Sequence, residues 1–302
     1  DRKTYRFGGT GKISGASSLT KTGPGTLILN NATPYDHTGG TLIDQGTLQV
    51  GDGVSFGAGF LPLNGIVNNA TVRFNRLDDD IYNGSITGNG TMVKDSFNVI
   101  TLAGPLNFTG QTVINDGILA LNSPANLGGT VTINANGTLR LDSTTGTISN
   151  PIVNNGTVEL NSTLSLNTSI SGTGGIFVNS PGTKTLGGTA SNTFTGDSLV
   201  SAGTLSLNKT GGGIAISGDL EITGGVVSLA QANQFGDDIS IRVNGGQLNT
   251  ANRADTMANL TINAASPVST NKSTARIPVS KRFWGTMVCG ISAASPPPPN
   301  MA

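Results

Sequence analysis

The sequence has 302 residues, with 17 basic and 17 acidic side chains, 44 glycines and only 5% aromatic residues. A formal net charge of zero without a basic stripe gives nucleic-acid binding little support. The apolar fraction of 35%, arranged periodically, argues against a disordered polar tract. The single cysteine, Cys289, allows no internal disulfide, which favours a bacterial surface protein over a disulfide-stapled eukaryotic domain.

The first well-formed element is a short unit, Gly-Thr-apolar-x-apolar, that occurs at residues 25–29 and again at residues 46–50. Two apolar residues separated by one residue lie on the same face of a β-strand. The glycine in front of each pair is typical of a tight turn. Residues 1–20 are expected to form a partial first turn of the same kind.

The same unit, or a close variant, returns along the chain. It is marked by Gly25, Gly46, Ala70, Gly90, Gly117, Gly137, Gly156, Gly175, Gly203, Gly225 and Gly246. Most markers follow one another at the short, regular interval that is typical of stacked solenoid turns. The steps from Gly90 to Gly117 and from Gly175 to Gly203 are longer. A loop can lengthen one turn of a solenoid without disturbing the next, so these steps are expected to be long turns.

The residues of each unit are expected to alternate between the core and the solvent. Arg73, Arg140 and Glu159 occupy the middle position and are predicted to point outward. A second strand is expected before most markers, with inward residues three positions before the marker: Ile43, Ile114, Val153, Val200, Ile222 and Val243. At the usual strand spacing these units predict an all-β, right-handed parallel β-helix of about 10–13 turns.

Residues 21–50 resemble a known repeat most closely. Lys21-Thr-Gly-Pro-Gly-Thr-Leu-Ile-Leu-Asn30, then residues 35–41 and 44–50, resemble the autotransporter-associated β-strand repeat, also called the passenger-associated transport repeat. Residues 108–121 and 194–207 match the second half of this repeat. The first half is degraded in both of these copies, where Lys94 and Lys184 are retained but the Gly-x-Gly is not. The resemblance implies a passenger of a bacterial surface or autotransporter-type protein, located outside the cell or on the outer membrane. Such passengers are often exported through a C-terminal β-barrel that this sequence lacks.

The pattern predicts two parts, a β-helix passenger segment over residues 1–266 and an irregular tail or cap over residues 267–302. The second part contains Trp284, Cys289 and four consecutive prolines at 296–299. A frayed or non-native tail, a cap or linker to a further module, and a binding motif remain open for it.

Few residues have the spacing of a chemical site. His37 is the single histidine and is expected in a loop, so His-dependent triads and multi-His metal sites are excluded within this chain. The cluster Asp78, Asp79 and Asp80 is a weak candidate for Ca²⁺ or for acid/base chemistry. Consecutive residues of an extended chain point in different directions, which favours a solvated turn, as for 237–238. Outward Thr and Ser side chains are read as scattered.

We therefore favour a structural or adhesive passenger segment that has no catalytic residues and no cofactor. The loops at 51–65 and 75–83 are expected to make contacts with a host or neighbouring-cell surface, a glycan or a second copy. A polysaccharide-acting enzyme is the first alternative. It needs a cleft shared by charged residues of adjacent turns, drawn from Asp78, Asp79, Asp80, Arg73, Arg76, Arg140 and Glu159. A self-associating surface-assembly module is the second alternative.

Overall fold

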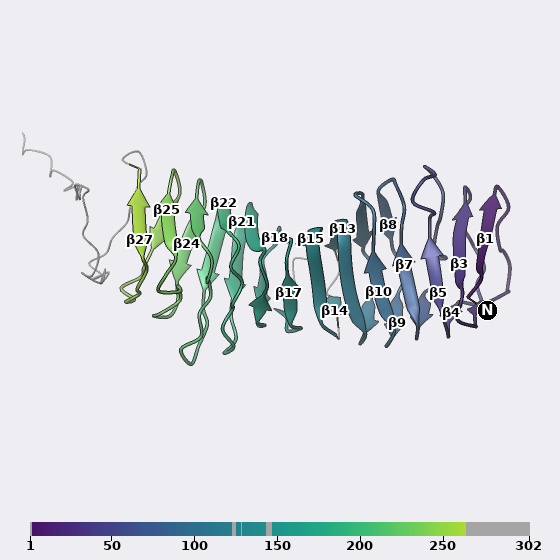
Figure 1. Cartoon of the computed structure of the whole chain (residues 1–302), viewed down its shortest axis with the longest axis horizontal. Helices are drawn as coiled ribbons and strands as arrows, with labels where there is room; N and C mark the ends of the chain where they lie inside the picture. Colours follow the sequence, from purple (N-terminus) through teal and green to yellow (C-terminus); the bar gives the residue numbers. More distant parts are fainter. Residues whose placement is uncertain (1, 123–124, 128, 143–146, 264–302) are drawn as a thin grey trace, which may run out of the picture.

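The computed structural model describes residues 2–122, 125–127, 129–142 and 147–263. These residues form 27 β-strands, all of whose pairings are parallel, and the described ranges contain no helix, hence none that could span a bilayer. The strands stack into a rod, with β1 at one end and β27 at the other (Figure 1). The predicted all-β solenoid is confirmed, with about 12 turns.

The first half of the rod contains β1 (Thr4–Gly9), β2 (Leu19–Lys21), β3 (Thr26–Asn31), β4 (Thr41–Ile43), β5 (Thr47–Val50), β6 (Ile66–Asn68), β7 (Thr71–Phe74), β8 (Asp80–Tyr82), β9 (Ile86–Gly88), β10 (Thr91–Lys94), β11 (Val99–Leu102), β12 (Leu106–Phe108), β13 (Gln111–Leu121) and β14 (Ala125–Leu127). The strands β2, β4, β6, β9, β12 and β14 form a separate six-stranded sheet.

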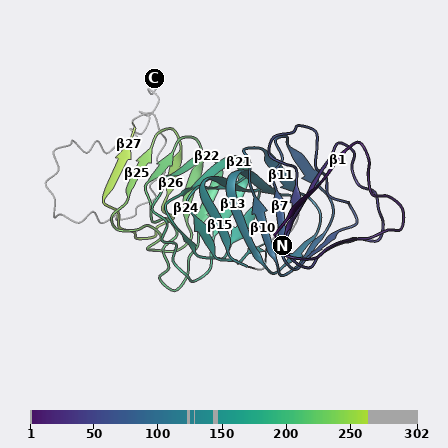
Figure 2. The ribbon, with the colours of Figure 1, turned by 45° about the vertical axis from the view of Figure 1, so that its right-hand side comes forward.

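The second half contains β15 (Val131–Leu141), β16 (Thr147–Ile148), β17 (Ile152–Asn154), β18 (Thr157–Leu160), β19 (Leu164–Leu166), β20 (Ile170–Ser171), β21 (Gly175–Leu186), β22 (Ser198–Leu207), β23 (Leu220–Ile222), β24 (Val226–Leu229), β25 (Ser240–Val243), β26 (Gln247–Asn249) and β27 (Asn259–Ile262). The ribbon winds around the long axis, so that strands from successive turns lie above one another (Figure 2).

The core is built from rows in which one inward side chain per turn packs on its equivalent in the next turn. One row runs through Leu102, Leu121, Leu141, Leu160, Val178, Val200, Ile222 and Val243. Most of these side chains are completely buried. A single turn has no second layer to cover its apolar face, so the stacking of turns is what removes this face from water.

The outward positions follow the prediction. Arg73, Arg140 and Glu159 each lie between two buried residues of their strands. Five of the six residues expected inward before the markers are buried, but Val153 is not. Its neighbour Asn154 takes the inward position opposite Ile133, and its amide donates a hydrogen bond of 2.9 Å to the carbonyl of Gly175. That bond satisfies the polar group that would otherwise exclude asparagine from the core.

The two long steps between markers do not correspond to long turns, which corrects the sequence prediction. Thr91 pairs with Gln111, and Phe177 pairs with Leu199, so each of these turns closes well before the next marker is reached. The unit occurs on more than one side of the solenoid, so two consecutive markers can belong to different sheet faces. The lengthened turn between Thr47 and Thr71 is real, because the loop at 51–65 is inserted there.

Lys21, which begins the first repeat, lies at a core position in register with Ile43. Its ammonium nitrogen donates to the carbonyl oxygens of Thr22 and Gly23, at 2.9 and 2.7 Å, and to that of Gln45 at 3.0 Å. The last of these belongs to the next turn. We call this arrangement the lysine clasp, since one buried side chain ties two turns together.

The two other lysines of the resemblance are buried in the same way. Lys94 bonds the carbonyls of Asp95 and Ser96 in its own turn and that of Asp116 in the next turn. Lys184 differs in that its three acceptors, Ser180, Pro181 and Gly182, all lie in its own turn.

A glycine follows each of these lysines in the next turn, and a Cβ on Gly46 or Gly203 would lie 2.7 or 3.2 Å from the ammonium nitrogen. Gly46, Gly117 and Gly203 have φ values of 70°, 64° and 67°. A Cβ at any of the three would lie 2.1 to 2.4 Å from a backbone carbonyl oxygen of the turn below. These positions require glycine both for the left-handed backbone and for the close contact.

Two further predictions from the sequence concern the segment 75–83 and the C-terminal tail. The segment 75–83, expected as a loop, contains the short strand β8, which pairs with β11. The tail at 267–302 lies outside the described residues, so the boundary at residue 266 stays a prediction.

Candidate functional site

The acidic cluster at 78–80 is held in place by contacts within the protein. Arg76 is 2% exposed, and its guanidinium lies 2.6 Å from an Asp78 carboxylate oxygen and 3.6 Å from one of Asp80. Asp79 accepts the backbone N–H of Val99 at 2.8 Å. Asp78 and Asp80 are thus paired and half-buried, whereas the sequence suggested a solvated turn.

Asp78 and Asp80 both face the guanidinium of Arg76, whereas Asp79 is bonded to the backbone of Val99. Burial raises the pKa of Asp80, and the charge of Arg76 opposes that shift. Across the part of the chain that the structure describes, no group of three or more His, Cys, Asp or Glu side chains could hold a metal ion. The cluster therefore ties the loop at 75–79 to its neighbouring turns.

The other charged residues considered for catalysis are also used separately. Arg73 pairs with Asp95 at 2.6 Å, and Arg140 pairs with Asp142 at 2.9 Å. Glu159 lies on the outer face, in register with Arg140. The two arginines are thus paired with aspartates other than Asp78, Asp79 and Asp80.

His37 lies in the loop between β3 and β4, as predicted, but it is completely buried. Its Nε2 is 3.1 Å from the hydroxyl of Thr41, and its Nδ1 has no partner. Tyr35 meets it edge-on, with 6.4 Å between the ring centres. This histidine packs the loop and is not available at the surface. Asp237 and Asp238 are exposed in a turn, as expected.

Exposed apolar side chains lie on loops and on the short strand β8 in the first half of the rod. Val54, Phe56, Ile81 and Phe97 are 74%, 73%, 60% and 67% exposed, respectively, and we call these four residues the apolar loop cluster. The first two lie in the loop at 51–65, and Ile81 lies in the segment 75–83. These are the two segments predicted to make contacts.

Hydrogen bonds hold the loops of this cluster together. The backbone N–H of Gly57, next to Phe56, donates to the carboxylate of Asp78 at 3.0 Å. The side-chain amide of Asn98, next to Phe97, donates to the carbonyl of Asp78 at 2.6 Å. Three consecutive turns therefore present apolar side chains from a fixed framework. Large exposed apolar patches are typical of interaction sites.

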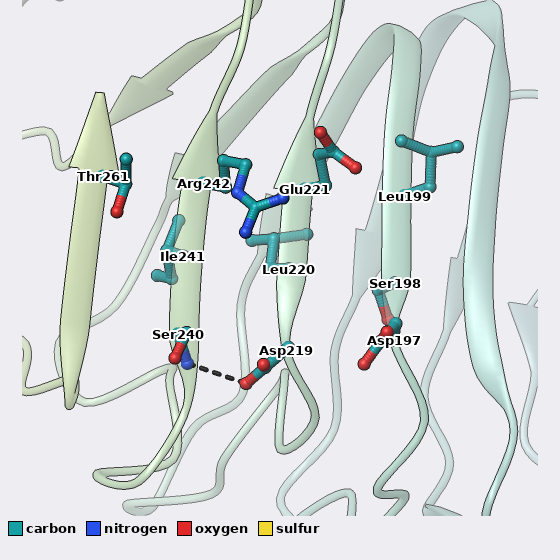
Figure 3. A pocket seen from close by; sticks show the side chains of 10 residues that line it. All are labelled: Asp197, Ser198, Leu199, Asp219, Leu220, Glu221, Ser240, Ile241, Arg242 and Thr261. Carbon is teal, nitrogen blue, oxygen red and sulfur yellow. Dashed lines mark hydrogen bonds between the residues drawn. The ribbon is translucent and has the colours of Figure 1, made fainter. Parts of the chain in front are cut away.

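A second surface feature was not anticipated from the sequence. A shallow cleft of about 210 Å³ crosses the outer face of β22, β23, β25 and β27 near the far end of the rod. Its lining residues are Asp197, Ser198, Leu199, Asp219, Leu220, Glu221, Ser240, Ile241, Arg242 and Thr261 (Figure 3). The acidic and basic residues of adjacent turns that the enzyme hypothesis required at one place are found here, on residues that the sequence did not single out.

The polar side chains of the cleft follow the strand register. Glu221 is the strand-register partner of Arg242, and Arg242 is the register partner of Thr261. The Asp219 carboxylate is fixed by the backbone N–H of Ser240 at 2.8 Å (Figure 3). The Arg242 side chain extends over β23, between Glu221 and Asp219 (Figure 3).

Outward hydroxyl groups are also aligned, in contrast to the expectation that they are scattered. Register places one of them in each of five successive turns, at Thr147, Ser165, Thr185, Ser206 and Ser228. The alternation of residues along a strand predicts that each of these side chains points outward. Their alignment along the rod could not be predicted without the number of residues in each turn.

A model of the passenger-associated transport repeat matches residues 19–50, 99–121 and 179–207. The chain carries passenger-associated transport repeats. Two of these matches contain a buried lysine, Lys21 and Lys184, and the third begins shortly after Lys94.

The passenger chain is also 35% identical over 102 residues to an autotransporter adhesin, BmaC, of Brucella suis biovar 1 (strain 1330). The similarity covers 33% of this chain and 3% of the relative. No solved structure matches the chain. The repeats and this relative assign the passenger to the extracellular space or the bacterial outer-membrane surface.

Proposed function

We propose that this passenger segment is adhesive and non-enzymatic, and that the apolar loop cluster makes its contacts with a partner surface. The observation that carries this proposal is the exposure of Val54, Phe56, Ile81 and Phe97 on consecutive turns of the rod. The adhesin relative supports the same role. Burying an apolar side chain of this size against a partner contributes about 1.5–3 kcal/mol.

The rod and the loops have different roles in this proposal. The buried rows and the lysine clasps fix the backbone, so the loops keep their places without a partner. Pre-ordered loops lose little conformational entropy on binding, which favours affinity. The charged residues near the cluster, Arg76 with Asp78 and Asp80, are already paired with one another. The cluster therefore favours a partner that contributes apolar surface.

The test compares the parent chain with the triple variant Val54→Ser, Phe56→Ser, Phe97→Ser. Binding of each purified chain to cultured animal cells, to bacteria displaying the chain and to polystyrene is measured by fluorescence. We expect at least about a tenfold loss of binding to one of these surfaces, because exposed aromatic anchors carry much of such contacts. Unchanged binding of the triple variant to all three surfaces contradicts the proposal.

The matched control is Ile262→Ser, which removes an exposed apolar side chain, 41% accessible, at the other end of the rod. It should bind like the parent. Sedimentation of the same proteins tests the self-association alternative: loss of a dimer together with loss of cell binding would identify a second copy as the partner.

A further inference from the structure

The outer face of the rod carries a continuous row of side chains with changing chemistry. Phe177, Leu199, Glu221, Arg242 and Thr261 are consecutive register partners on β21, β22, β23, β25 and β27. Four of the five line the cleft described above, and Phe177 extends the row by one strand. Neighbouring strands lie about 4.8 Å apart, so the row runs along the rod for about 19 Å.

The apolar part of the row is Phe177 and Leu199, which lie between Glu159 on one side and Glu221 on the other. Phe177 and Leu199 are half-buried, so each keeps part of its side chain in contact with solvent at an outward position. An aromatic ring on a flat sheet face offers a platform for the C–H face of a sugar ring, which is apolar and similarly flat. A carboxylate cluster alone would have no such platform.

The remaining part of the row offers hydrogen-bonding groups of both kinds. The carboxylate of Glu221 accepts hydrogen bonds, and the guanidinium of Arg242 donates them. Bonds between such charged groups and hydroxyls are stronger than those between neutral groups. The Glu221 carboxylate is directed toward the Leu199 side of the row, while Arg242 extends over β23 (Figure 3). Together they suit the alternating donor and acceptor character of sugar hydroxyls.

The charge of the cleft restricts the ligand further. Asp197, Asp219 and Glu221 supply three carboxylates against the single guanidinium of Arg242. The excess negative charge disfavours acidic polysaccharides, because like charges repel at short range. The strand spacing is close to the length of one pyranose ring, so a linear chain of sugars lying along the rod would meet one strand per ring.

We propose that this row is a binding site for a linear neutral oligosaccharide, with a sugar ring on Phe177 and hydroxyls bonded to Glu221 and Arg242. The site lies on residues separate from the apolar loop cluster. It adds a second, polar contact to the passenger and does not rest on the adhesive role proposed above.

The probes are cellohexaose, which is neutral, and hexagalacturonic acid, which is acidic and of equal length. Each is titrated into the purified 302-residue chain and followed by ligand-observed NMR and calorimetry. We expect cellohexaose to bind and the acidic probe to bind at least about tenfold more weakly, since its carboxylates face those of the cleft.

Two variants locate the site. Phe177→Ala removes the platform and Glu221→Gln removes the charged acceptor, and each should weaken cellohexaose binding about tenfold. The isosteric Glu221→Gln change retains the side-chain volume, so it remains informative if Phe177→Ala disturbs folding. Asp44→Asn, at an exposed corner in the first half of the rod, is the matched control and should bind like the parent.

Three outcomes overturn the proposal: no binding of cellohexaose, tighter binding of the acidic probe, or full binding by both site variants. Phe97→Ala separates the two proposals. It should weaken the cell contact while leaving cellohexaose binding unchanged, so failure at one surface is distinguishable from failure at the other.

Discussion

The ammonium nitrogen of Lys94 lies 3.2 Å from the backbone carbonyl oxygen of Asp116, which belongs to the next turn of the solenoid. Two carbonyls of its own turn, those of Asp95 and Ser96, complete the contact at 2.7 and 2.6 Å. A charged side chain thus occupies a core position between Phe74 and Ile114. The bonds explain why an apolar row tolerates it.

Replacing Lys94 by Met should destabilise the rod. Methionine fills similar space but leaves three partly buried carbonyls without the lysine donor, which costs about 2–4 kcal/mol in the free energy of unfolding. Denaturant titration measures the loss, and hydrogen exchange should place it in the turns around β10 and β13. The control is Lys12→Met, which removes a lysine from an exposed pair with Asp36 and should change stability by less than about 1 kcal/mol. Equal effects of the two changes would mean that the clasp contributes nothing.

Replacing Gly117 by Ala should be costly for a separate reason. Its φ is 64°, and an added Cβ would lie 2.4 Å from the carbonyl oxygen of Ser96. Left-handed backbone alone costs an L-residue about 1–2 kcal/mol, and the collision adds to it. Gly11→Ala is the control, because a Cβ there meets nothing within 4 Å. Thermal melting of both variants checks the difference, and a Gly117→Ala protein as stable as the control would contradict the geometry.

Adjacent residues of β15 should respond oppositely to substitution. Leu139 is completely buried, so Leu139→Asp places an unpaired charge in the core and should cost several kcal/mol, unfolding the stack around it. Arg140→Ser removes only the half-exposed pair with Asp142, and about 1 kcal/mol or less is expected. Circular dichroism during urea unfolding distinguishes them. A large loss from Arg140→Ser would show that the inward and outward assignment of this strand is inverted.

Stability should rise with pH between about 8 and 10. Burial lowers the pKa of Lys94 to about 8 from 10.5, against the opposing charges of Asp116, Asp95 and Asp79, and burial also lowers the pKa of Lys209 to about 8. In this window the unfolded chain binds more protons than the folded chain, so the free energy of unfolding increases with pH. The neutral amine of Lys94 still donates hydrogen bonds to the clasp.

The rise should end near pH 10. Burial raises the pKa of Tyr35 to about 12, so above pH 10 the unfolded chain loses a proton that the folded chain keeps, and stability falls. Urea midpoints measured from pH 7 to 11 test this profile, and Lys94→Met should show a shallower rise. A steady decline from pH 7 would contradict the assigned sign.

The sequence predicted the architecture because strand alternation and the glycine unit are local signals. Leu27 and Leu29 face the core, and Arg140 faces outward, as their spacing requires. The cleft was not predictable in the same way. Leu199, Glu221 and Arg242 belong to three different turns, and only the length of each turn aligns them. The marker steps hid that length where successive markers lay on different faces of the solenoid, as at Gly175 and Gly203. Asn154 was missed because its core position depends on a hydrogen bond to Gly175, which lies in a later strand.

The loop at 51–65 is inserted into one turn while Thr47 and Thr71 still pair in register. The length of this loop therefore does not affect the stacking of the solenoid turns on either side of it. A loop of such a chain can be replaced by another without changes in the neighbouring turns, and whole turns can be added or lost without changes in the loops that remain. The length of the rod and the binding properties of its loops can therefore evolve independently.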